Sequence, residues 1–82
     1  MINMDPIEAD FARLRRKIGA TASAIASTEE RIACTFDRIA ADRPRDAARL
    51  RAQAAQARQI AARERDRAEA YGWDPGAPEG GE

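Results

Sequence analysis

The chain lacks histidine and has one cysteine, one tryptophan, one tyrosine and two phenylalanines among 82 residues. Histidine is the commonest metal ligand and general base, so its absence removes much of the usual catalytic chemistry. A lone Cys34 cannot form a disulfide within the chain. The sequence also has no Gly-rich phosphate loop, no nucleophile beside a base and no carboxylates with ligand spacing. We therefore predict that the protein is not an enzyme and binds no cofactor or metal.

Charge and hydropathy bear on two further classes of protein. The 14 basic and 14 acidic residues cancel, so bulk electrostatics argue neither for nor against nucleic acid as a partner. No apolar run is long enough to span a bilayer, and no secretory signal is recognisable. We expect a cytoplasmic protein without membrane contact.

Apolar residues are present at heptad spacing over the first half of the chain. They form two rows offset by three residues, and such 3-4 spacing indicates a helix that buries one stripe against another helix. The first row is Met4, Phe11, Ile18, Ile25, Ile32 and Ile39, and the second is Ile7, Leu14, Thr21, Thr28 and Thr35. A long helix with a helical partner is the expected structure.

Capping residues predict where the helices begin and end. Asp5 followed by Pro6 is a strong helix start, and Pro44 marks the one internal break, where Asp42 or Arg43 could cap a second helix. Gly72 is suited to the position after a helix end, with Trp73 folding back. We expect a lead-in at 1–5, a hairpin at 6–71 with helices at about 6–41 and 44–71, and a cap with a disordered tail at 72–82.

The second helix has a heptad row of its own, made mostly of alanine. Its members are Ala47, Leu50, Ala54, Ala57, Ala61, Glu64, Ala68 and Tyr71. If the chain reverses near residue 43, large residues of the first helix face small ones of the second. The expected pairs are Ile39 with Ala47, Phe36 with Leu50, Ile32 with Ala54 and Ile25 with Ala61. At the open end, Phe11 and Leu14 would approach Tyr71 and Trp73.

These patterns predict an all-α protein: an antiparallel, coiled-coil-like two-helix hairpin that completes a four-helix bundle by dimerisation. The alternative is a nearly continuous rod, kinked at Pro44, that pairs only between chains. About a quarter of the residues are alanine, which contributes little core volume, so a single hairpin of this composition is marginal.

We therefore expect a helical protein–protein interaction or regulatory module, whose partner is itself or another helical protein. Charged residues beside the seam, such as Glu8, Arg15, Glu29 and Arg31, would set which partner is accepted. The predicted partner interface consists of Ile7, Phe11, Leu14, Ile18, Ile25, Ile32 and Ile60.

The alternative function is a nucleic-acid-associated regulator that uses the Arg-rich second helix. The candidate phosphate contacts are Arg45, Arg49, Arg51 and Arg58. Acidic residues interleave with these arginines, and no aromatic platform accompanies them, which favours the interaction module. A third class, a ligand sensor with a pocket built by an oligomer, also stays open.

Overall fold

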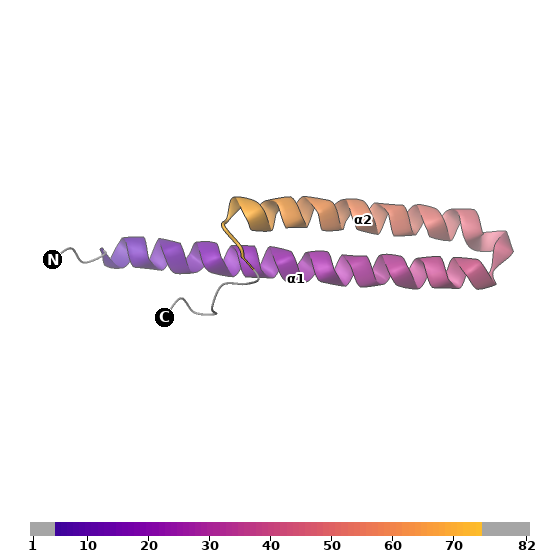
Figure 1. Cartoon of the computed structure of the whole chain (residues 1–82), viewed down its shortest axis with the longest axis horizontal. Helices are drawn as coiled ribbons and strands as arrows, with labels where there is room; N and C mark the ends of the chain where they lie inside the picture. Colours follow the sequence, from indigo (N-terminus) through magenta and orange to yellow (C-terminus); the bar gives the residue numbers. More distant parts are fainter. Residues whose placement is uncertain (1–4, 75–82) are drawn as a thin grey trace.

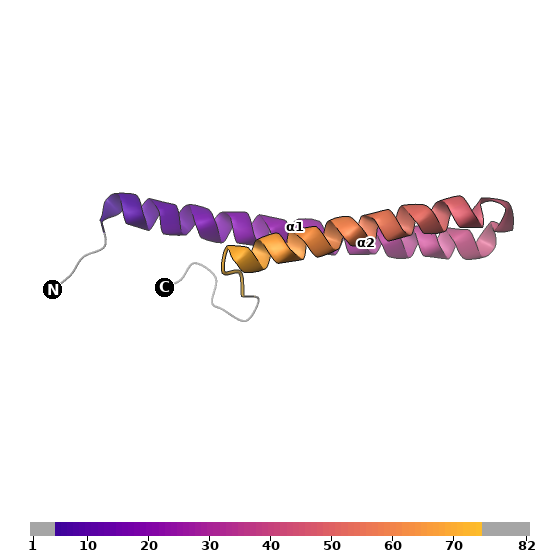
Figure 2. The same cartoon turned by 90° about the horizontal axis from the view of Figure 1, so that it is seen from above.

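The computed structural model describes residues 5–74 as two helices joined by a short 3₁₀ turn. Helix α1 spans Pro6–Asp42, the turn η1 spans Pro44–Asp46, and helix α2 spans Ala47–Ala70. The two helices lie side by side and run in opposite directions (Figures 1 and 2). The predicted hairpin is confirmed, and the rod kinked at Pro44 is wrong. Residues 1–4 of the expected lead-in at 1–5, which include Met4 of the first row, and residues 75–82 of the expected cap and tail at 72–82 lie outside the described residues.

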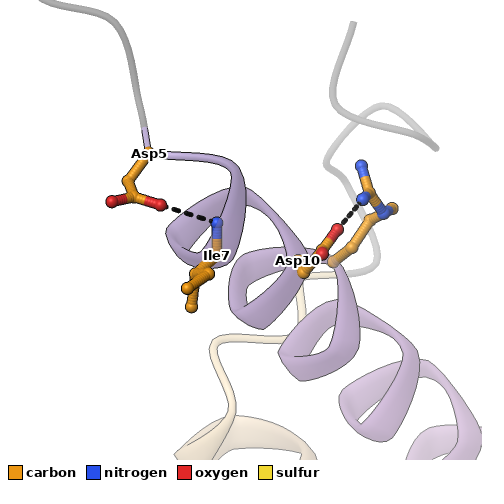
Figure 3. A network of polar contacts seen from close by, with 4 residues as sticks. Asp5, Ile7 and Asp10 are labelled. Atoms are coloured by element: carbon orange, nitrogen blue, oxygen red, sulfur yellow. Dashed lines mark hydrogen bonds and ion pairs between the residues drawn. The ribbon is translucent and has the colours of Figure 1, made fainter.

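Helix α1 begins at the predicted cap. The Asp5 carboxylate accepts a hydrogen bond from the backbone N–H of Ile7 at 2.8 Å, and Pro6 occupies the first helical position. One turn later, Asp10 pairs with Arg13 on the outer surface (Figure 3). The cap satisfies a backbone donor that the helix itself leaves free, so the start of α1 is determined locally.

The turn between the helices differs from the expected cap. Asp42 is the last residue of α1, and the backbone N–H of Arg43 donates to the carbonyl of Ala40 at 3.3 Å. Pro44 then begins the 3₁₀ turn, and Asp46 takes the N-cap position of α2 without a side-chain hydrogen bond. Arg43, one of the two predicted caps, therefore takes the N-cap position of η1 at the expected start, Pro44, but neither Asp42 nor Arg43 caps α2, because η1 separates both residues from it.

The contact between α1 and α2 is made almost entirely of small side chains. Phe36 is the one large residue of α1 that packs against the centre of this contact, beside Ala33, Ala54 and Ala57. Small residues allow two helix axes to approach toward the short end of the usual range of about 8–10 Å. We call the buried residues of this contact the alanine seam: Gly19, Ala22, Ala26, Ala33 and Ala40 of α1, with Leu50, Ala54, Ala57, Ala61 and Ala68 of α2.

The predicted contact face of α2 is confirmed, but that of α1 is wrong by one residue. Ala26, Ala33 and Ala40 are buried, whereas the isoleucine that precedes each of them is 37–39 % exposed. One residue corresponds to a rotation of about 100° around the helix. Since α2 presents mainly methyl groups, facing alanines allow the closest approach, and branched isoleucines at the centre would hold the helices apart.

The C-terminal end of α2 is closed by the predicted glycine cap. Gly72 has φ of 76°, its N–H donates to the carbonyl of Glu69, and the N–H of Trp73 donates to that of Ala68, both at 2.9 Å. This pair of bonds is the Schellman arrangement. It returns Trp73 to α1, where a methyl group on Gly19 would lie 3.1 Å from the Trp73 Cβ. The absence of a side chain at Gly19 thus permits Trp73 to approach α1 closely.

The expected cluster of aromatic residues at the open end does not form around Phe11. Phe11 and Leu14 are 61 % and 52 % exposed, and the ring of Tyr71 lies instead under the Arg15 guanidinium, 5.1 Å from its centroid. The reason is the length of the helices: α1 has 37 residues and α2 has 24, so α1 continues past the point where α2 ends.

The tight seam predicts that Ala54→Leu lowers the free energy of unfolding by about 1–3 kcal/mol, because the larger side chain forces the helices apart. Chemical denaturation, with the loss of helicity as the signal of unfolding, measures the change in the free energy of unfolding. Ala55→Leu, at the exposed neighbouring position, is the matched control and should have little effect. Equal effects of the two substitutions would contradict the close alanine packing.

The positive φ of Gly72 predicts that Gly72→Ala destabilises the hairpin by about 1–2 kcal/mol. Thermal unfolding measures this loss, and Trp73 fluorescence reports whether Trp73 leaves its position beside Gly19. Gly72→Asn should lose less, since asparagine adopts the left-handed region more readily. If alanine and asparagine were both neutral, the cap would have no energetic role.

Candidate interaction surface

The N-terminal part of α1 extends beyond the end of α2 (Figure 1). The last turn of α2 and the residues after it contact Gly19, so about 12 residues of α1, or ~18 Å, lie beyond that contact. Ile7 and Phe11 are in this extension and are 63 % and 61 % exposed. The extension is therefore a helical segment whose apolar side chains have no partner among the described residues.

The extension is the first part of a longer apolar stripe. Large side chains follow each other at 3-4 spacing along the whole of α1 and stay at least partly exposed, with exposed threonines between them. The exposed apolar area is on the order of 500 Å², at the upper end of what a monomer leaves in one patch. We call this set the isoleucine stripe: Ile7, Phe11, Leu14, Ile18, Thr21, Ile25, Thr28, Ile32, Thr35 and Ile39.

The isoleucine stripe borders two shallow grooves on one edge of the hairpin. The first is lined by residues of α1 only: Thr28, Arg31, Ile32, Thr35 and Phe36. The second lies between the helices and is lined by Lys17, Ile18, Thr21, Ile25, Glu64 and Arg67. On α2, the half-buried Ile60 shares the face of Glu64 and Arg67, since it precedes them by four and seven residues. This edge is thus apolar along α1 and mixed along α2.

The opposite edge of the hairpin is closed by two ion pairs between the helices. Arg58 of α2 binds Asp37 of α1 at 2.6 Å, and Arg65 binds both carboxylate oxygens of Glu30 at 2.5 and 3.0 Å. The hydrogen bond from Arg65 lowers the pKa of Glu30, opposed by partial desolvation, and the Glu30 and Asp37 carboxylates raise the pKa of Arg65 and Arg58.

These pairs are also consistent with the observed rotation of α1. Turning α1 by one residue, to bring Ile25 and Ile32 toward α2, would carry Glu30 and Asp37 about 100° away from their arginines. Sequence reasoning missed both pairs. The signal that could have found them is a shared spacing: the two acids are seven residues apart, and so are the two arginines.

Two of the four candidate phosphate contacts have acidic partners. Arg58 binds Asp37, and Arg49 lies 3.7 Å from Asp46. Arg45 and Arg51 form no ion pair within residues 5–74 and are exposed. No finding tests nucleic-acid binding, which stays a prediction.

Over the described range, no group of three or more histidine, cysteine, aspartate or glutamate side chains is placed to hold a metal ion. Neither described helix has the length and apolar character needed to cross a membrane. Cys34 is exposed and has a free thiol. The surface that remains to be explained is the isoleucine stripe.

Comparison with protein-family models, curated proteins and solved structures gives no match to this chain.

The lowered pKa of Glu30 predicts an acid-sensitive contribution to stability. A lowered folded-state pKa stabilises the fold above the ordinary glutamate value of about 4.3, and this contribution is lost as the pH falls through the folded-state value. Denaturation midpoints measured from pH 7 to 2 should decline less steeply for Glu30→Gln than for the native chain. Glu29→Gln is the matched control, and an unchanged slope for Glu30→Gln would contradict the pairing with Arg65.

Proposed function

We propose that this protein is a non-enzymatic helical protein–protein interaction module that binds a partner helix through the isoleucine stripe. One observation carries the proposal. The stripe extends along the whole of α1 and stays at least partly exposed, although α1 already has an intramolecular partner on a different face.

The distribution of apolar side chains supports an external partner. Complete burial of a leucine, isoleucine or phenylalanine contributes about 1.5–3 kcal/mol, whereas a single carbon contributes about 0.8 kcal/mol. The alanine seam uses methyl groups and one leucine, and the isoleucine stripe holds most of the larger residues. Much of the available hydrophobic stabilisation is therefore realised only when something covers the stripe.

The angle between the two faces of α1 suits a bundle. Along the part of α1 that α2 covers, stripe residues such as Ile25 and Ile32 directly precede seam residues such as Ala26, so the two faces are about 100° apart. In a four-helix bundle each helix touches two neighbours that lie roughly at right angles around it. With α2 as one neighbour, the stripe is directed at the position of the second.

The spacing of the stripe defines the chemistry of the partner. Anchors at positions i, i+4, i+7 and i+11, as in Ile7, Phe11, Leu14 and Ile18, are read by another amphipathic helix. Grooves of this shallow form along α1 suit apolar side chains from such a helix, and charged neighbours such as Lys17 and Arg31 border them. The expected partner is therefore an apolar helix face with a charged rim.

The proposal predicts that Ile25→Asp weakens association at least tenfold, or by about 1.4 kcal/mol or more, because a carboxylate would be buried in the interface. The measurement is the mass, by light scattering, of the affinity-purified chain together with any polypeptide that co-purifies at fixed stoichiometry. Ser27→Asp, an exposed position off the stripe, is the matched control and should keep the complex.

Stability separates this interface role from an ordinary core role. At concentrations where only monomer is present, Ile25→Asp should leave the helicity of the hairpin close to that of the native chain. If Ile25→Asp instead unfolds the monomer as severely as Ala54→Leu, or if complexes survive it unchanged, the stripe is not the binding surface.

A further inference from the structure

We infer that the partner of the isoleucine stripe is the same stripe of a second copy, bound antiparallel with the two-fold axis near residue 23. This inference rests on the proposed function and specifies its partner. In this arrangement two residues face each other across the interface when their numbers add up to 46.

The matching of large and small side chains carries the inference. Antiparallel helices place the first heptad row of one copy opposite the second row of the other. Phe11, Ile18 and Ile25 then each face a threonine, and every layer contains at least one large apolar residue. The layers are Ile7 with Ile39, Phe11 with Thr35, Leu14 with Ile32, Ile18 with Thr28, and Thr21 with Ile25.

Other arrangements cover the stripe less well. A parallel pair places each row against itself, so Thr21, Thr28 and Thr35 would form three layers of threonine alone, with no large apolar side chain in any of them. Moving the antiparallel register by one heptad in one direction leaves Ile39 without a facing residue. Moving it in the other direction leaves Ile7 without a facing residue of α1 and places Phe11 opposite the charged Asp42. The register near residue 23 pairs every described member of the stripe.

Charges beside the stripe agree with this register. Arg15 lies near Glu29 of the second copy, and Asp10 lies near Arg38 of the second copy, each contact occurring twice by symmetry. The third flanking pair, Lys17 with Arg31 of the second copy, has like charges at exposed positions. Attractive contacts therefore outnumber repulsive ones by two to one.

The extension of α1 gains a partner in the same register. Residues 6–17 of one copy lie beside 29–40 of the other, next to the closed end of its hairpin. Both α2 helices then lie on one side of the α1 pair, because each packs on the face next to the stripe. They meet in the central section, near Ile60, which gives the middle of the dimer four helices.

Spin labels on the natural thiol can test the orientation without altering the sequence. Cys34 is exposed and is the one cysteine of the chain. In the antiparallel dimer residue 34 lies beside residue 12 of the second copy, so the two labels are 22 residues apart, or ~33 Å along the axis. In a parallel dimer the two labels lie at the same level along the axis, with almost no axial separation.

A second labelling position makes the test independent of label length. Ser27 is exposed and lies one heptad before Cys34, on the same outer face of α1. In a Cys34→Ser, Ser27→Cys variant, the antiparallel dimer brings the labels to within 8 residues, or ~12 Å along the axis. Double electron–electron resonance should therefore show a marked shortening between the two positions, whereas a parallel dimer gives equal distances.

The outcomes separate this inference from the proposed function. A mass equal to one chain, or equal label distances at the two positions, overturns the antiparallel self-pairing. A monomeric chain that forms an Ile25-dependent complex with a different polypeptide overturns this inference alone. Complexes that survive Ile25→Asp overturn the proposed function as well.

Discussion

The close contact between alanines of α1 and α2 is the constraint on which the rest of the structure depends. A seam of methyl groups brings two helices near each other, but it buries little apolar surface and excludes branched side chains from its centre. Every large apolar residue of α1 except Phe36 is therefore left outside or beside the contact. As a direct consequence of this packing, α1 buries its small residues against α2 and leaves most of its large apolar residues at least partly exposed.

The ends and edges of the hairpin decide where the unsatisfied surface lies. Arg58 with Asp37 and Arg65 with Glu30 close one edge with charged groups, so the apolar residues gather on the other. The Schellman cap at Gly72 ends α2 and seats Trp73 against Gly19, which leaves the first turns of α1 without a neighbour among residues 5–74. Exposed ion pairs add little stability by themselves, and these two form in the rotation of α1 that the alanine packing already sets.

The proposed association would couple folding to binding. A two-helix chain with a small core has little stability in reserve, and a partner that binds only the folded hairpin adds stability in proportion to the logarithm of its concentration. The proposed module would therefore be most stable where its partner is abundant. If the partner is a second copy, the stability of the hairpin itself depends on protein concentration.

The sequence alone determined the elements with local causes. Asp5 and Pro6 start α1, Pro44 interrupts the chain, Gly72 ends α2, and the row from Leu50 to Ala68 identifies the packed face of α2. Each of these features depends on a few neighbouring residues, and each was predicted from them.

The tertiary structure alone decided which face of α1 meets α2. Two faces of α1 follow the same 3-4 spacing and lie one residue apart: the isoleucine stripe, which holds most of the large side chains, and the α1 side of the alanine seam, which is mostly small. Periodicity cannot choose between these two faces. Sequence reasoning chose the isoleucine stripe as the contact face because large apolar residues usually form the core. The choice of Ala26, Ala33 and Ala40 comes from long-range facts: α2 offers methyl groups at that height, and Glu30 and Asp37 reach their arginines in that rotation alone.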